Sequence, residues 1–260
     1  MSILNEIIEH KKKEVFETRS MVNPLTYNLV PMFKKTRVRL KKRLLDHKGP
    51  AIIAEFKRQS PSVGSINPMC DTKEIAPAYE AAGAVAMSVL TDDKYFGGEM
   101  QDLRDARRAC KLPLLRKDFI IEEYQLLQSK AYGADIILLI AAALSKEDCA
   151  NLAEKAKALK LDVMLEIHNE AELEYLDGNI DFVGVNNRDL TTMKVDVENA
   201  LRLAPMIPSK YIKVAESGIN SVDTVKKLYE AGYKLFLIGE HFMKEDEPGF
   251  AATEFINALK

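Results

Sequence analysis

The residues of this chain best suited to acid–base chemistry stand where short apolar runs end. Five such runs lead into charged or amide-bearing side chains: Glu55 and Lys57, Arg116 and Lys117, Glu166, Asn186 and Arg188, and Glu216. A buried strand gains nothing from an ionised group at its end, because burying an unpaired charge costs several kcal/mol. A series of these ends therefore predicts parallel strands whose C-terminal ends converge on one polar pocket.

Two of these ends carry lysines that are suited to proton transfer. Glu55 and Lys57 lie two residues apart, so on a strand their side chains share a face and would form a charge pair at the pocket floor. An exposed edge strand would show the same spacing. Lys117, placed near Glu55 or Glu166, would remain charged and could donate a proton once desolvated. A lysine in a surface loop is the alternative interpretation of Lys117.

Other strand ends carry groups that bind hydroxyls and anions. Asn186 offers a neutral hydrogen bond, and Arg188 offers a rigid cationic fork for a carboxylate or phosphate. Free backbone N–H groups around Ser60 suit an anion. Glycines at two later strand ends would let backbone amides approach a phosphate, in the segments Ser217-Gly218 and Gly239-Glu240. Simple turn glycines remain the alternative at both places.

The elements that must position these residues form a repeat of strands and helices. Eight apolar runs are predicted to be strands: 51–56, 85–90, 113–117, 136–140, 162–167, 182–185, 211–216 and 235–238. Amphipathic segments predicted to be helices lie between them: 71–82, 99–110, 121–132, 146–159, 169–176, 196–205 and 221–231. Four of the runs follow a glycine expected to end a helix in left-handed conformation: Gly83, Gly133, Gly178 and Gly232. Eight units favour a single closed (β/α)8 barrel over an open doubly wound sheet.

The first 48 residues differ in character from the rest. Residues 3–18 have helical spacing, and residues 20–48 resemble an irregular arm with a short helix. We therefore predict an N-terminal helical extension, residues 1–48, over the C-terminal face of a catalytic barrel, residues 49–260. The extension holds 12 lysines and arginines against 5 acidic residues. Its basic stretch, residues 34–43, is interpreted as a solvated face or a flap near an anionic substrate rather than as a nucleic-acid site.

Composition argues against several other classes. No apolar run is long enough to cross a membrane, and the first residues lack a signal-peptide pattern. Three scattered cysteines, Cys70, Cys110 and Cys149, fit a reducing cytoplasm. The four histidines show no metal-ligand spacing, so we expect no metal site.

Six motifs in order resemble the indole-3-glycerol phosphate synthase family. They are Ile53-Ala54-Glu55-Phe56-Lys57-Arg58-Gln59-Ser60-Pro61-Ser62, Leu90-Thr91-Asp92 with Tyr95-Phe96-Gly97-Gly98, Leu115-Arg116-Lys117-Asp118-Phe119-Ile120, Leu165-Glu166-Ile167, Gly184-Val185-Asn186-Asn187-Arg188-Asp189-Leu190, and Ala215-Glu216-Ser217-Gly218-Ile219. The resemblance runs from the N-terminal helix to the end of the barrel.

The resemblance implies a reaction and a set of roles. A carboxy-lyase of tryptophan synthesis would close the ring of 1-(2-carboxyphenylamino)-1-deoxyribulose 5-phosphate, a phosphosugar, and release carbon dioxide and water without a metal or organic cofactor. Lys117 resembles the general acid, Glu55 and Glu166 the acid/base carboxylates, Lys57 the partner of the substrate carboxylate, and Asn186 a hydroxyl-orienting group. The substrate- and phosphate-binding positions would be Ser60, Arg188, Ser217, Gly218, Gly239 and Glu240.

One position departs from some relatives, which carry serine where this chain has Glu240. A carboxylate aimed at a phosphate would repel it, so we expect only the backbone N–H of Glu240 to contact the anion. Two other functions are compatible with such a barrel: a phosphoribosyl isomerase and a non-catalytic phosphate-binding barrel. Lysines and glutamates stand where such isomerases use an Asp or Cys pair, and the intact set argues against a non-catalytic barrel. The sequence leaves open a monomer or an association with other tryptophan-pathway enzymes.

Overall fold

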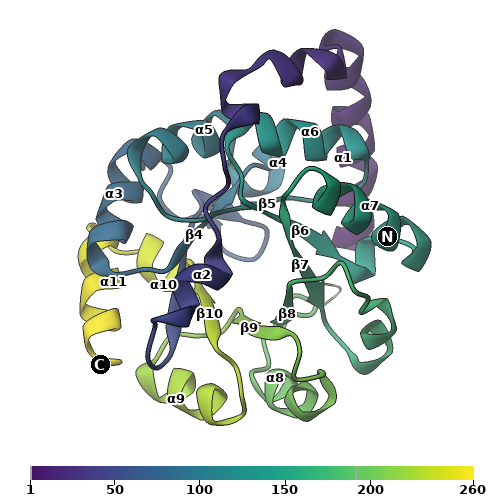
Figure 1. The fold of residues 1–260 in the computed structure, drawn as a ribbon. Helices are drawn as coiled ribbons and strands as arrows, with labels where there is room; N and C mark the ends of the chain where they lie inside the picture. The colour runs from purple at the N-terminus through teal and green to yellow at the C-terminus, as the bar shows by residue number, and fades with distance from the viewer. Residues whose placement is uncertain (1, 191) are drawn as a thin grey trace.

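Eight parallel strands close into one barrel in the computed structural model, which describes residues 2–190 and 192–260. They are β1 (Ala51–Phe56), β4 (Ala86–Leu90), β5 (Leu114–Lys117), β6 (Ile136–Ile140), β7 (Asp162–Ile167), β8 (Phe182–Asn186), β9 (Ile212–Glu216) and β10 (Leu235–Ile238). Neighbours in the barrel are neighbours in this order, and β10 pairs with β1. The predicted (β/α)8 fold is confirmed (Figure 1).

Helices connect these strands and form the outer layer (Figure 1). They are α3 (Thr72–Ala82), α4 (Asp93–Phe96), α5 (Met100–Ala109), α6 (Glu123–Tyr132), α7 (Lys146–Ala158), α8 (Glu198–Leu203), α9 (Val222–Glu230), α10 (Glu240–Met243) and α11 (Pro248–Asn257). Short 3₁₀ helices, η3 (Ala141–Ala143), η4 (Glu170–Tyr175) and η5 (Ala204–Met206), and a two-stranded hairpin, β2 (Gln59–Ser60) with β3 (Gly64–Ser65), complete the connections.

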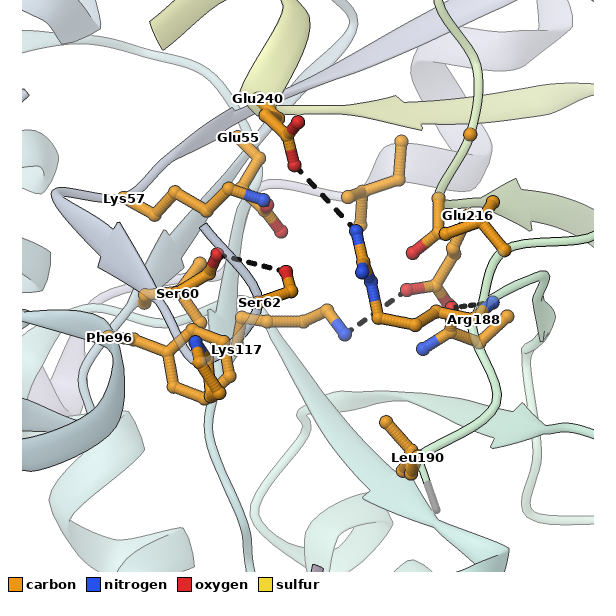
Figure 2. A pocket seen from close by; sticks show the side chains of 18 of the residues that line it. Glu55, Lys57, Ser60, Ser62, Phe96, Lys117, Arg188, Leu190, Glu216 and Glu240 are labelled. Carbon is orange, nitrogen blue, oxygen red and sulfur yellow. Dashed lines mark hydrogen bonds and ion pairs between the residues drawn. The ribbon is translucent and has the colours of Figure 1, made fainter. Parts of the chain in front are cut away.

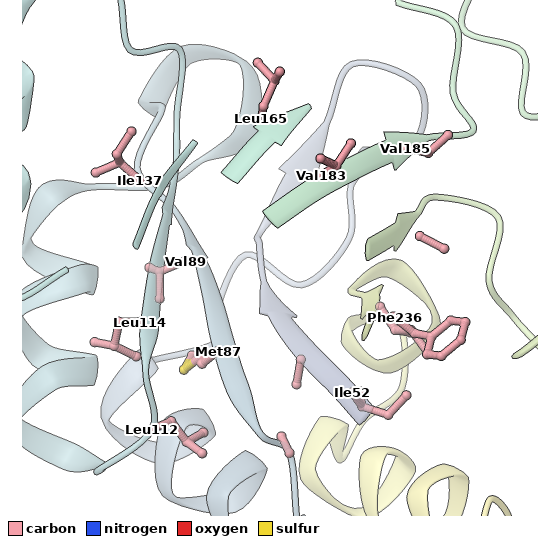
Figure 3. Packing of buried hydrophobic residues seen from close by; sticks show 14 of the residues in the cluster. Ile52, Met87, Val89, Leu112, Leu114, Ile137, Leu165, Val183, Val185 and Phe236 are labelled. Atoms are coloured by element: carbon pink, nitrogen blue, oxygen red, sulfur yellow. The ribbon is translucent and has the colours of Figure 1, made fainter. Parts of the chain in front are cut away.

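Alternation along each strand separates two apolar layers. Ile52 and Phe56 of β1 face outward and pack with the helices, in the cluster shown in Figure 3. Ala51 and Ile53 face inward and fill the barrel with Leu115, Met164, Phe182 and Val214. Successive side chains on a strand point to opposite faces, so the next inward position after Ile53 is Glu55. The same counting brings Lys117, Glu166, Asn186 and Glu216 to the top of the interior.

The first helix of the extension, α1 (Ile3–Met21), lies over the C-terminal end of the barrel, as predicted. Lys11 is fully buried, and its Nζ lies 2.9 Å from Asp92 and 3.0 Å from Asp118. Asp92 follows β4, and Asp118 follows Lys117 directly. Burial alone would lower the pKa of Lys11, but the carboxylates around it raise that pKa instead, so Lys11 stays a cation. This ion pairing fixes α1 to two strand ends.

The second half of the extension lies elsewhere. After η1 (Pro24–Leu29) and η2 (Pro31–Lys34), the chain crosses the opposite mouth of the barrel into α2 (Leu40–Leu45), toward the viewer in Figure 1. Leu40 packs among the interior residues, while Arg39 lies 2.6 Å from Asp162 at the start of β7. Lys41 lies 2.7 Å from Asp181, which precedes β8. The alternative of a basic flap near the substrate is therefore wrong for residues 37–43.

A few local predictions also need correction. Residues 169–176 form the 3₁₀ helix η4 rather than an α-helix, and Gly178 is not left-handed, whereas Gly83, Gly133 and Gly232 are. The β2–β3 hairpin, α4 and α11 have no counterpart among the predicted elements. Among the described residues, none of the helices has the length and apolar character needed to span a bilayer. The domain boundary at residue 48 stays a prediction.

Candidate active site

A cavity of about 630 Å³ opens at the C-terminal end of the barrel. All eleven residues proposed from the sequence line it: Glu55, Lys57, Ser60, Lys117, Glu166, Asn186, Arg188, Ser217, Gly218, Gly239 and Glu240. They come from β1, β5, β7, β8 and the segments after β1, β8, β9 and β10. Figure 2 shows Lys57, Lys117, Arg188 and the glutamates extending into this shared space. The structure therefore brings the whole predicted set together.

Lys117 occupies the centre of the charged floor. Its Nζ lies 2.7 Å from Glu166 Oε2 and 3.1 Å from Glu216 Oε2, and its side chain is 14% exposed. Burial alone would favour the neutral amine, but the two carboxylates outweigh it and raise the pKa of Lys117 above its ordinary value. Lys117 is thus a fixed ammonium that faces the cavity.

The two carboxylates on Lys117 differ in their surroundings. Burial favours the protonated form of Glu166, yet its Oε1 accepts a 3.0 Å hydrogen bond from Asn186 Nδ2, and Lys117 and His168 lower its pKa well below the usual range. Burial raises the pKa of Glu216 to about 7, with repulsion from Glu166 and Glu55 adding to the effect. At neutral pH the site therefore holds one firmly ionised carboxylate beside one that readily takes a proton.

Glycines make room for two of the acids. A Cβ on Gly184, in β8, would collide with the Glu216 carboxylate. A Cβ on Gly239 would lie 2.9 Å from Glu55 Cβ and closer still to its carboxylate. Glu55 is in turn paired with Lys57, whose Nζ lies 2.9 Å from Oε1. The predicted charge pair of Glu55 and Lys57 is therefore present.

The other end of the cavity is lined by backbone turns and an arginine. Ser217 and Gly218 both have positive φ, 65° and 72°, and a Cβ on Gly218 would lie 2.5 Å from Val195 Cγ1. Residue 218 must therefore be glycine because its φ is positive and because a Cβ would collide with Val195. Arg188 Nη2 lies 3.7 Å from Glu240 Oε2, and Glu240 is partly exposed (Figure 2).

Comparisons with known proteins bear on this geometry. A sequence profile described as Indole-3-glycerol phosphate synthase matches residues 4–255. A protein of that name from Bacteroides thetaiotaomicron is 48% identical over 99% of both chains. Another of that name, from Acidithiobacillus ferrooxidans, is 42% identical over 96% of both chains.

The chain belongs to the indole-3-glycerol phosphate synthase family. A solved structure, tryptophan synthase subunit alpha from Legionella pneumophila, superposes with a TM-score of 0.61 at 13% identity, over 85% of this chain and 94% of that one. At that identity the likeness concerns the fold alone.

In this member of the indole-3-glycerol phosphate synthase family, one wall of the cavity is apolar. Side chains of α1 and of the loops after β4, β5 and β8 form it: Leu4, Ile7, Phe96, Phe119 and Leu190. A flat apolar group can pack there while its polar substituents reach the charged floor. Among the described residues, no group of three or more His, Cys, Asp or Glu is arranged to hold a metal ion.

Two residues, Glu216 in the site and His168 beside it, receive no role from the sequence. Glu216 ends an apolar run as Glu166 does, and that signal was present although no role was given to it. His168 was regarded only as an isolated histidine. Its Nε2 lies 3.3 Å from Glu166 Oε1, a contact that an inward-facing Glu166 and the turn after β7 create and that residue spacing does not reveal.

Proposed function

We propose that this chain closes the ring of 1-(2-carboxyphenylamino)-1-deoxyribulose 5-phosphate to give indole-3-glycerol phosphate, carbon dioxide and water, as a cytoplasmic enzyme of tryptophan synthesis. The observation that carries the proposal is Lys117, a buried ammonium held between Glu166 and Glu216 at the floor of a cavity with one apolar wall. Family membership supplies the substrate class. The geometry supports a division of roles.

Lys117 is the general acid of ring closure. A carbon of the phenyl ring attacks the ribulose carbonyl, and the carbonyl oxygen becomes a hydroxyl as the new C–C bond forms. A positioned ammonium stabilises the growing negative charge on that oxygen and delivers the proton. Loss of carbon dioxide then returns the bonding electrons to the ring, and loss of water completes the indole.

The carboxylates share the remaining proton transfers and charge stabilisation. Glu166, firmly ionised, suits the stabilisation of positive charge on the anilino nitrogen and the acceptance of a proton in the dehydration. Glu55, paired with Lys57, is the second acid/base carboxylate. Glu216, whose pKa is raised to about 7, is a further group able to exchange a proton at neutral pH. Asn186 orients a substrate hydroxyl.

The substrate anions are held at two places. Lys57 pairs with the carboxylate that is lost and assists dehydration. The phosphate is held by Ser60, Arg188, the Ser217-Gly218 turn and the backbone at Gly239 and Glu240, all of which line the same cavity. The Arg188 guanidinium, 3.7 Å from the Glu240 carboxylate, must exchange that partner for the phosphate. The Glu240 side chain then turns away, so only its backbone N–H contacts the anion.

One assay tests this function directly. The purified chain, without added metal, is mixed with the carboxyphenylamino-deoxyribulose phosphate, and the fluorescence of the indole product is followed. We expect turnover with the wild type and a loss of at least about 10²-fold with Glu166→Gln, purified in parallel to exclude a contaminating enzyme. Absence of product from the wild type would overturn the proposal and leave the isomerase or the non-catalytic barrel.

A further inference from the structure

His168 contacts an active-site residue but does not line the cavity. It follows β7 directly, two residues after Glu166, and its side chain is 12% exposed. The cavity lining includes Glu166 but not His168. Its ring stands between two carboxylates, with Nε2 3.3 Å from Glu166 Oε1 and Nδ1 3.4 Å from Glu172 Oε2. The imidazole thus contacts Glu166 without lining the cavity.

The surrounding chain fixes this ring. The backbone N–H of His168 donates to Glu172 Oε2 at 2.7 Å, and its carbonyl accepts from Asn199 Nδ2 at 3.0 Å. Asn169 Nδ2 donates to the second oxygen of Glu172 at 2.7 Å. Burial alone would favour the neutral imidazole, but the nearby carboxylates of Glu166 and Glu172 raise the pKa of His168 to about 10. A cation is therefore held at this position at neutral pH.

We propose that His168 is a positioning residue that fixes the Glu166 carboxylate for the reaction without touching the substrate. Glu166 Oε1 is shared by Asn186 and His168, which leaves Oε2 directed at Lys117. Without His168, Asn186 alone would hold Oε1, and the carboxylate could rotate away from Lys117. This inference rests on the proposed function, because it assigns Glu166 a part in the chemistry.

Two substitutions separate positioning from a merely structural role. The side-chain amide of His168→Gln reaches the place of Nε2, next to Glu166, whereas that of His168→Asn reaches only the place of Nδ1, next to Glu172. We expect His168→Asn to lower kcat about tenfold with little change in KM, on the scale seen when a partner behind an active-site ligand is removed. His168→Gln should retain most of the wild-type kcat at neutral pH.

The matched control is His47→Asn. His47 is half-buried at the opposite end of the barrel, where its ring contacts the carbonyl of Pro50. It should leave kcat and KM unchanged. Thermal unfolding of all three variants establishes that each is folded at the assay temperature.

The pH profile supplies a second readout. The charged groups around His168 are Glu166 and Glu172, and Glu166 also faces Lys117 on β5 and Glu216 on β9, with Glu55 of β1 close to Glu216. Both His168 variants remove a positive charge beside Glu166, which raises its pKa, so the acidic limb of the kcat profile should move to higher pH.

These measurements distinguish the possible failures. An unchanged kcat in His168→Asn, or equal losses in both variants with an unmoved acidic limb, would show that His168 only supports the fold. An inactive wild type would instead overturn the proposed function and this inference with it.

Discussion

Three buried acids at the N-terminal end of this barrel and three buried glutamates that line the cavity at its C-terminal end have different partners. At the N-terminal end are Asp135, Asp162 and Asp181, and at the C-terminal end are Glu55, Glu166 and Glu216. Asp135 accepts from the backbone N–H groups of Val38 and Leu114 and pairs with Arg107. The cations on Asp162 and Asp181 come from the extension and from α7. No substrate cavity is needed to explain these three.

Two of the three buried glutamates at the C-terminal end share one lysine. Lys117 lies between Glu166 and Glu216. Glu166 also contacts Asn186 and His168, whereas burial raises the pKa of Glu216 to about 7. We call the N-terminal end, which α2 covers, the closed end, and the C-terminal end, which holds the cavity, the open end.

The largest expected effect comes from removing the central cation of the open end. Lys117→Met keeps the stem length and much of the packing but loses the proton donor, so kcat should fall at least roughly 10²-fold with KM and fold little changed. The matched change at the closed end is Lys41→Met, which removes a half-exposed partner of Asp181 and should leave kcat unaltered. Steady-state kinetics of both variants decide the point. A Lys117→Met enzyme keeping more than about a tenth of wild-type kcat would move the acid role to Lys57 or to a carboxylic acid.

The closed end should control stability instead. Leu40 is 1% exposed and packs among the interior residues, so Leu40→Ala should cost about 2–5 kcal/mol in the free energy of unfolding, with unchanged KM. Urea unfolding and kinetics on the same sample measure both. Leu45→Ala is the control, because Leu45 lies in the same helix but is 81% exposed. A raised KM in Leu40→Ala would mean that α2 acts on the pocket after all.

Deleting residues 1–45 should therefore destabilise the barrel itself.

Glu216 should make the free energy of unfolding depend on pH. The pKa of Glu216 lies at about 7 in the folded chain, against 4.5 for an ordinary glutamate. Between pH 4.5 and 7, unfolding therefore releases a proton from Glu216. The contribution of Glu216 to the free energy of unfolding accordingly falls as pH rises through this range. Glu216→Gln removes this dependence. Its stability relative to wild type should rise across that interval by up to roughly 3 kcal/mol. Unfolding titrations at pH 5 and pH 8 measure the difference, and a constant difference would contradict the raised pKa.

The smallest effect is expected at Glu240. Its carboxylate is partly exposed and 3.7 Å from Arg188, and exposed ion pairs contribute at most about 1 kcal/mol. Glu240→Gln should therefore lower KM no more than about fivefold, by releasing Arg188 for the phosphate, and leave kcat unchanged. A large rise in KM would show that the carboxylate itself has a binding role.

Much of the fold and the placement of the site followed from the sequence. Apolar runs alternating with amphipathic segments predict the barrel. Period-two alternation predicts that Glu55, Lys117 and Glu166 point inward, and their positions near the ends of their strands place them at one end of the barrel. The position of α2 did not follow, because the basic stretch 34–43 reveals charge but not its partners. Those partners, Asp162 and Asp181, lie far along the chain and are brought near only by closure of the barrel. The raised pKa of Glu216 depends in the same way on three acids from separate strands.

The glycine at residue 184 links two positions that are 32 residues apart in the sequence, because the Glu216 carboxylate fills the space that a side chain would occupy. The effects of substitutions at Gly184 and Glu216 should therefore depend on each other. Alanine at 184 should inactivate the enzyme by displacing the carboxylate, and a shorter acid, Glu216→Asp, should be recovered among its suppressors. Gly239 and Glu55 form a second such pair. Where a library of variants is screened for activity, these four positions should accept changes in pairs more readily than one at a time.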